Sequence, residues 1–191
     1  AATEDYPTTQ IDNGKTGKCV KLETRLTGDL GNMVGMPIAA GNLFIGSFDM
    51  LNAITNPLSA TRFGTPFYNK PLRLTGYYKY KAGEQFYENG EYTSRKDIFN
   101  IYAIFYDGVK YDSAGKGTDV TLDGNLPNQN YEHSSMVALA LVSNPQETEG
   151  DEWKFFDIPF DYQRYGKKID EARLAKGEYK IGIIFASSKD G

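Results

Sequence analysis

The sequence predicts an all-β protein, a two-sheet antiparallel β-sandwich with at most one short helix. In the stretch 72–80, leucine and tyrosine take most even positions, and the odd positions carry Arg73, Thr75, Tyr77 and Lys79. This period of two, with aromatic and β-branched residues, suits a half-buried sheet and fits a helix poorly. The pattern recurs along the chain without a long helical interruption, and 191 residues suit one β domain.

The first half of the chain is expected to contain three strands separated by turns. Residues 1–17 are polar and rich in turn residues, so a loop is predicted there. Strands are predicted over 19–26, 42–49 and 72–80, with a long loop over 28–41 and a compact turn-bearing segment over 62–67.

The second half contains the strands that we expect to be most deeply buried. Residues 97–107 are apolar on both faces, which predicts a central strand covered on both sides, followed by a turn at Asp107-Gly108. Pro159 places the strand 153–162 at an edge or a bulge. The remaining predictions are a loop over 83–95, strands over 118–122, 135–142 and 178–188, a helix over 169–175, and a single domain over 1–191.

Composition excludes several classes of function. The 21 basic and 25 acidic residues are interspersed and give a net charge of −4, which argues against a nucleic-acid partner. No run of the given sequence reaches the length of a transmembrane segment or has the pattern of a secretory signal. The 14 tyrosines and 20 glycines fit an extracytoplasmic β protein.

Residue types that commonly act in catalysis form no recognisable catalytic motif in this sequence. Cys19 and His133 are the only cysteine and histidine, so they are interpreted as a strand residue and a loop residue without a zinc site. A glycosidase needs two carboxyl groups across a cleft, but no spacing selects a pair among the acids on or beside strands: Asp97, Asp107, Asp157 and Asp161. No catalytic residue is therefore predicted.

Structural calcium is the one cofactor that the sequence offers. Asp12, Asn13 and Thr16, with Asp190 at the other end of the chain, supply oxygen ligands in turn-rich segments. Asn and Asp also stabilise turns through their own backbone, and we favour this interpretation over a calcium site.

Recognition of a sugar needs flat apolar rings together with planar polar groups. Tyr77, on the polar face of its strand, and Trp153 are the candidate rings, whereas Tyr78 and Tyr80 on the leucine face are expected in the core. Candidate polar groups are Arg62, Arg73 and Asp157.

The segments 60–67 (ATRFGTPF) and 70–80 (KPLRLTGYYKY) strongly resemble the putative carbohydrate metabolism domain family, and 18–24, 97–106, 153–160 and 177–191 are similar to it. The resemblance implies a jelly roll similar to galactose-binding and carbohydrate-binding modules, found in surface or periplasmic lipoproteins of glycan-foraging Gram-negative bacteria. It transfers no catalytic residues. Family members usually have a strand before the Asp12 loop and another after residue 191, so both are expected to be absent from this chain.

The leading hypothesis is a non-catalytic carbohydrate-binding or accessory domain outside the cytoplasm, anchored through a region outside this chain. Its partner would be an oligo- or polysaccharide, bound weakly because a shallow site buries little area. One alternative is a structural domain whose exposed edge pairs with other surface proteins. The other is a glycoside hydrolase.

Overall fold

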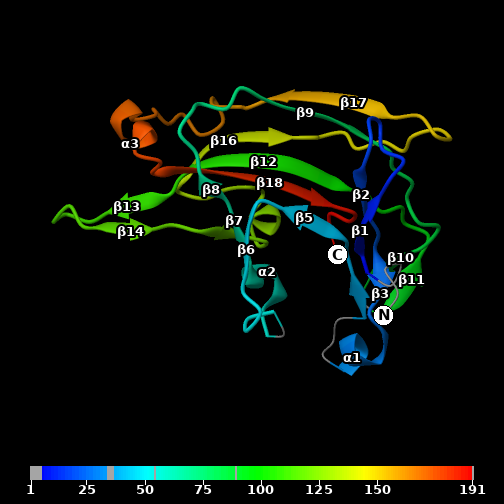
Figure 1. Ribbon diagram of the computed structural model, residues 1–191. Coiled ribbons are helices and arrows are strands. Elements are labelled where there is room, and N and C mark those ends of the chain that lie inside the picture. The colour runs from blue at the N-terminus through cyan, green and yellow to red at the C-terminus, as the bar shows by residue number, and fades with distance from the viewer. Residues whose placement is uncertain (1–5, 34–36, 54, 89, 191) are drawn as a thin grey trace.

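The computed structural model describes residues 6–33, 37–53, 55–88 and 90–190, and it confirms the all-β prediction (Figure 1). The strands are β1 (Thr8–Ile11), β2 (Cys19–Leu22), β3 (Arg25–Leu26), β4 (Ile38–Ala39), β5 (Asn42–Phe44), β6 (Gly46–Phe48), β7 (Thr61–Phe63), β8 (Thr65–Pro66), β9 (Arg73–Tyr78), β10 (Phe86–Glu88), β11 (Glu91–Thr93), β12 (Asn100–Asp107), β13 (Val109–Tyr111), β14 (Gly117–Asp119), β15 (Leu122–Asp123), β16 (Met136–Leu141), β17 (Lys154–Pro159) and β18 (Tyr179–Ala186). The α-helices in these ranges are α1 (Gly28–Met33), α2 (Pro57–Ala60) and α3 (Glu171–Ala175), and η2 (Pro127–Gln129) is a short 3-10 helix.

The central sheet has the strand order β16-β12-β18-β5, and β8 also pairs with β18. All pairings are antiparallel; Ala103 of β12, for example, lies opposite Ala140 of β16 and Ile183 of β18. The predicted burial of the segments 97–107 and 135–142 is confirmed, because β12 is buried from Asn100 to Tyr106 and β16 from Met136 to Ala140.

One face of the central sheet is covered by a two-stranded ribbon made of β9 and β17 (Figure 1). Ile101, Ala103 and Phe105 of β12 share a core cluster with Leu74 and other inward residues of this ribbon. The alternation predicted for the segment 72–80 is therefore confirmed in β9, with Tyr77 exposed between half-buried Gly76 and buried Tyr78. Leu72, which precedes β9, is 70% exposed because it lies outside the paired strand.

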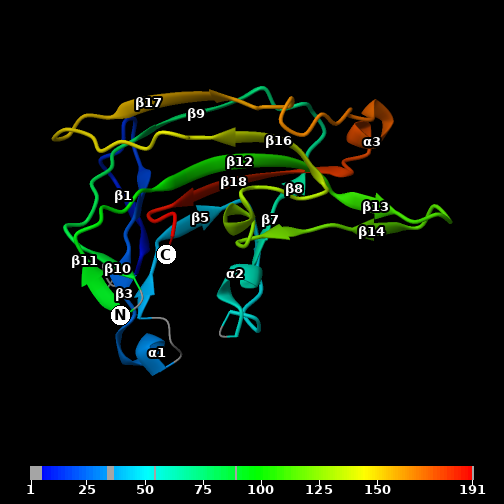
Figure 2. The ribbon, with the colours of Figure 1, turned by 180° about the vertical axis from the view of Figure 1, so that it is seen from behind.

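The opposite face of the central sheet is covered by β6, β7 and β15, which form a small sheet of their own. Tyr102, Ile104 and Tyr106 of β12 pack on this side, where Phe63 of β7 belongs to the same cluster. The Tyr106 hydroxyl donates a 2.6 Å hydrogen bond to the Phe63 carbonyl. Figure 2 shows, from behind, that α2 and β7 lie on this side and the ribbon on the other. The β12 strand thus separates two apolar layers.

Several elements differ from the sequence prediction. The predicted strand 42–49 is divided between Phe44 and Gly46. The φ angle of Gly46 is +155°, and a Cβ atom on this residue would lie 1.9 Å from the Arg62 carbonyl oxygen, so only glycine fits there. As a result, β5 pairs with β18 and β6 pairs with β7. The predicted loops over 1–17, 28–41 and 83–95 contain β1, then α1 and β4, and then the β10–β11 hairpin.

The helical content also corrects the sequence prediction, which allowed only one helix. The helix α3 lies in the predicted segment, and the Asp170 side chain caps it by accepting the Ala172 and Arg173 N–H groups. The additional helices α1 and α2 have six and four residues. Such short helices are set by turn and cap residues, as by Pro57 at the start of α2, and give no helical periodicity to detect. No helix of the described ranges is long and apolar enough to cross a membrane.

Candidate functional site

Four of the five candidate sugar-binding residues lie on the outer side of the ribbon. Arg73 and Tyr77 are exposed on β9, Asp157 is exposed on β17, and Trp153 directly precedes β17. In the β9–β17 register Phe155 lies opposite Tyr77 and Asp157 lies opposite Thr75, so odd-numbered residues of both strands share this side. We call this surface the ribbon face; it comprises Arg73, Tyr77, Lys79, Trp153, Phe155 and Asp157.

The middle of the ribbon face is a pair of exposed aromatic rings. Tyr77 is 49% exposed and Phe155 is 53% exposed. Their centroids are 5.1 Å apart and their planes are inclined by 49°. Sequence reasoning missed Phe155, although its alternation with Trp153 and Asp157 was a usable signal.

Charged side chains flank these rings on both sides. The Arg73 Nε atom donates to Asp157 Oδ1 at 2.5 Å, and this bond raises the pKa of the Arg73 guanidinium. The Lys79 ammonium lies 5.0 Å from the Trp153 ring centroid and 3.1 Å from Asp151 Oδ1. The face therefore combines apolar rings with oriented donors and acceptors.

The turn between β1 and β2 adds one residue that the sequence did not suggest. Lys15, which is exposed in this turn, places its ammonium 5.4 Å from the centroid of the Tyr77 ring. The hairpin itself is attached to β5, because the Thr8 hydroxyl donates to the Asn42 carbonyl at 2.9 Å. A residue distant in sequence thus forms a rim beside the exposed rings.

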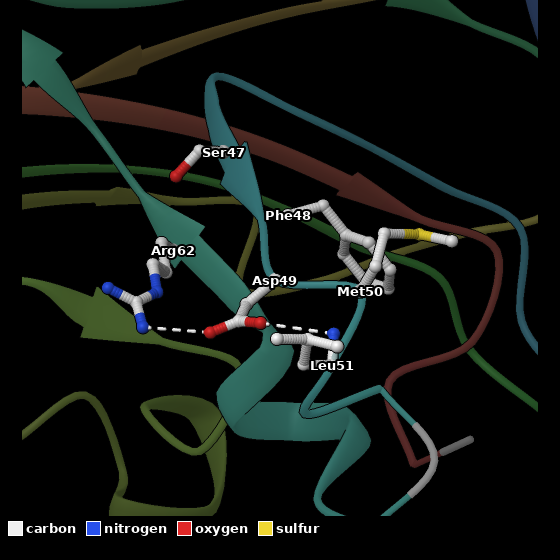
Figure 3. Close-up of a pocket in the computed structure, with 6 residues that line it drawn as sticks. All are labelled: Ser47, Phe48, Asp49, Met50, Leu51 and Arg62. Carbon is white, nitrogen blue, oxygen red and sulfur yellow. Dashed lines mark hydrogen bonds and ion pairs between the residues drawn. The ribbon is translucent and has the colours of Figure 1, made fainter.

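The structure places Arg62 apart from the other candidates, on β7 at the opposite side of the central sheet. Its guanidinium pairs with Asp49 at 2.9 Å, beside an open depression of about 490 Å³ that is also lined by Ser47, Phe48, Met50 and Leu51 (Figure 3). Partial burial would raise the pKa of Asp49, but hydrogen bonds from Asn52, Arg62 and Leu51 outweigh it and lower that pKa.

His133 and Cys19 match their structural interpretations. The Nδ1 atom of His133 accepts the Ser135 N–H at 3.1 Å in a loop, and burial together with Lys167 lowers the pKa of the imidazole. Cys19 is a half-buried residue of β2, opposite Ile11 of β1.

The calcium candidates lie in two different settings. Asp12, Asn13 and Thr16 belong to the β1–β2 turn, whereas Asp190 pairs with Arg95 at 2.8 Å. Within the described ranges, no three His, Cys, Asp or Glu side chains are grouped so that they could hold a metal ion.

We expect calcium to leave the thermal stability of the protein unchanged. A site occupied at a hundred times its dissociation constant would stabilise the fold by about 2.7 kcal/mol. Thermal unfolding in millimolar calcium and in EDTA measures this difference, and a rise of several degrees in calcium would instead establish the metal site.

Comparisons with known proteins find a family model and solved structures that are similar to this chain. The family model for a putative carbohydrate metabolism domain matches residues 1–191. The chain is similar to a solved structure from Bacteroides vulgatus, described as a putative glycoside hydrolase, with 53% identity, a TM-score of 0.88 and coverage of 98% of this chain and 70% of that one. A second structure with the same description, from Bacteroides thetaiotaomicron, has 49% identity and a TM-score of 0.84, and the match covers 97% of this chain and 51% of that one.

The chain thus spans about half the length of the second relative. A search among curated proteins finds no match. The family match extends over every segment that carries the resemblance in the sequence, and the two solved relatives share the fold at high identity. The chain belongs to the putative carbohydrate metabolism domain family.

Proposed function

We propose that this domain binds an oligo- or polysaccharide on the ribbon face and does not transform it. The observation that carries the proposal is the exposed Tyr77–Phe155 ring pair beside the Arg73–Asp157 ion pair. The carbohydrate-related family and the description of the two relatives as glycoside hydrolases support a sugar as the ligand.

The chemistry of this surface matches that of a sugar ring. The C–H face of a pyranose is apolar and packs on the aromatic rings of Tyr77 and Phe155. The Arg73 guanidinium keeps donors beyond the Nε–H that Asp157 accepts, and the carboxylate of Asp157 accepts hydroxyl protons. Because β9 and β17 pair over six residues, these groups are held on a rigid support.

The open shape of this surface favours the side of a polymer over a small enclosed ligand. The rings of the ribbon face are about half exposed on the outer side of a two-stranded ribbon, and Lys15 forms a rim contact beside them. A flat site buries little area, so the affinity for a single sugar unit should be weak.

The hydrogen bonds and ion pairs of the carboxylates support binding without catalysis. The acids that sequence reasoning considered are each held by a different group: Asp97 by the Ser188 hydroxyl, Asp107 by Arg173, Asp157 by Arg73 and Asp161 by the N–H groups of Gln163 and Arg164. The depression beside Arg62 contains one carboxylate, that of Asp49. A glycosidase needs two carboxyl groups facing each other across the scissile bond.

The proposal includes a location outside the cytoplasm, with anchoring through a region outside this chain. The tyrosine-rich composition and the resemblance to surface and periplasmic proteins support this location. Fractionation of cells that carry the native gene tests it, and recovery of the protein in the cytoplasmic fraction would contradict it.

Removal of the exposed rings should weaken glycan binding. Each of Tyr77→Ala and Phe155→Ala should cost about 2 kcal/mol of binding free energy, about thirtyfold in Kd, because each removes a stacking surface. Calorimetry on the glycan selected from an array measures the change.

The matched control for this experiment is Phe48→Ala, which removes a ring that is 50% exposed on the opposite side of the central sheet. It should leave Kd unchanged. A loss caused by Phe48→Ala or Arg62→Gln, with none from Tyr77→Ala, would place the binding site at the depression and overturn the proposal. Release of reducing sugar from the bound glycan would establish hydrolysis.

A further inference from the structure

The β10–β11 hairpin carries a second pair of aromatic rings, separate from those of the ribbon face. Tyr87 of β10 lies directly opposite Tyr92 of β11. Their ring centroids are 5.2 Å apart and their planes are inclined by 68°, so the two rings meet edge to face. Tyr92 is 55% exposed and Tyr87 is half-buried. One side of the hairpin thus presents aromatic surface to solvent.

The other side of the hairpin attaches it to the domain. Phe86 is buried, and the Arg95 guanidinium lies 3.7 Å from the centroid of its ring. Arg95 also pairs with Glu88 at 3.5 Å and with Asp190 at 2.8 Å. Because successive residues of a strand point to opposite sides, Phe86 and Glu88 lie on this attached side and Tyr87 lies on the other. The tyrosine side is therefore held in place without being covered by these contacts.

An open depression of about 400 Å³ lies beside the tyrosine side of the hairpin. It is lined by Asn32 and Pro37 from the segment between β3 and β4, and by Tyr87 and Gly90 from the hairpin. Asn32 is an exposed residue of α1, and the Thr27 N–H closes this segment by donating to the Pro37 carbonyl at 2.9 Å. Figures 1 and 2 show α1 and the hairpin below the central sheet, with the ribbon above it.

The depression offers the chemistry of an uncharged sugar. All four lining residues are uncharged, unlike Arg73, Lys79 and Asp157 of the ribbon face. The Asn32 amide and the tyrosine hydroxyl both donate and accept hydrogen bonds, as sugar hydroxyls do, and the tyrosine ring suits the apolar C–H face of a pyranose. The volume also falls within the range of about 300–1,000 Å³ that is usual for small-ligand sites.

We propose that this depression is a second glycan-binding site, selective for neutral sugar units. A pyranose ring would pack on Tyr87 and Tyr92, and its hydroxyls would bond to the Asn32 amide. We call it the hairpin site. The choice of a sugar as ligand rests on the proposed function, whereas the position of the site rests on the ring pair and the depression. Two sites on one domain strengthen retention on a polysaccharide, because binding at one raises the effective concentration at the other.

Affinity electrophoresis of the 191-residue chain tests the hairpin site. The probes are three neutral polysaccharides, starch, galactomannan and xyloglucan, each set into a native gel. We expect at least one of them to retard the chain. Tyr92→Ala removes the more exposed ring and should weaken binding to that polysaccharide at least about tenfold in Kd. Tyr92→Phe keeps the ring and should stay within about twofold of the wild type.

A variant on the opposite wall keeps the test valid if Tyr92→Ala disturbs the hairpin. Asn32→Ala removes the amide that bonds to the sugar and should weaken the same binding about fivefold. The matched control is Tyr68→Ala, at a tyrosine that is 59% exposed in the connection between β8 and β9. It belongs to neither ring pair and should leave Kd unchanged.

The outcomes separate the hairpin site from the ribbon face. Binding that Tyr77→Ala weakens, but neither Tyr92→Ala nor Asn32→Ala does, would overturn the hairpin site and leave the proposed function standing. Binding that Tyr92→Ala and Asn32→Ala weaken, with no effect of Tyr77→Ala, would support the hairpin site and contradict the ribbon face. Absence of retardation by all three polysaccharides would overturn the hairpin site. Equal retardation by polygalacturonate, lost in Tyr92→Ala, would overturn its selectivity for neutral sugars.

Discussion

Phe105→Ala should lower the free energy of unfolding by about 3–5 kcal/mol, because it removes a large side chain from a close-packed core. Phe105 lies on β12, between β16 and β18, and its side chain has no exposure to solvent. Its ring is stacked on that of Tyr179 at 5.4 Å and meets Tyr162 edge-on at 6.4 Å. Neighbours on β18 and in the segment that follows β17 would lose contacts together, so the cavity cannot close through the shift of one side chain.

Urea denaturation measures this loss, and Phe155→Ala is its matched control. Phe155 is the same residue type, also on a strand, but it is 53% exposed. Its removal should change the free energy of unfolding by less than about 1 kcal/mol. Equal losses in the two variants would contradict the assignment of Phe105 to the core and Phe155 to the surface.

Arg173→Met should be the second most destabilising change, at about 2–3 kcal/mol, because it leaves two carboxylates without their cation. The Arg173 guanidinium donates to both oxygens of Asp107 at 2.7 and 2.6 Å, to Glu178 at 2.6 Å and to the Val109 carbonyl at 2.8 Å. These bonds join α3 to the ends of β12 and β18. The expected loss of unfolding free energy is smaller than for a fully buried ion pair, because the side chains of Arg173, Asp107 and Glu178 are 22%, 28% and 15% exposed.

The effect of Arg173→Met should depend on pH. The hydrogen bond from Arg173 is the main cause that lowers the pKa of Glu178 below its ordinary value of 4.5. A carboxyl group whose pKa is lower in the folded state stabilises the fold above its unfolded pKa, and this contribution is lost as the pH falls through the folded pKa. The difference between wild type and Arg173→Met should therefore be largest near neutral pH and shrink in acid.

Arg73→Met provides the control for this pH series. The Arg73–Asp157 pair is similar in chemistry, but its side chains are 50% and 37% exposed. Exposed pairs contribute less than about 1 kcal/mol, so this variant should retain most of the stability. Unfolding measured at neutral and acidic pH distinguishes the two pairs. A difference for Arg173→Met that does not change with pH would contradict its role as the partner of Glu178.

The pattern of apolar and polar residues was sufficient to predict the long strands of the fold. The apolar residues on both faces of the segment 97–107 indicated β12, and the period of two in the segment 72–80 placed Tyr77 on an exposed face. Strands of two to four residues, such as β1 and β10, and the helices α1 and α2 were missed. They are too short to show a period, and their place depends on the strands that they contact.

The sequence by itself determined the all-β class, the buried central strands and the side of each strand that carries the polar residues. Only the tertiary structure decided that Phe155 lies opposite Tyr77, that Arg62 belongs to another surface, and that the β10–β11 hairpin borders a depression. The physical reason is the range of the interactions. Alternation records whether each side chain faces water or the core, whereas the choice of partner strand and register depends on contacts between segments that are distant in the chain.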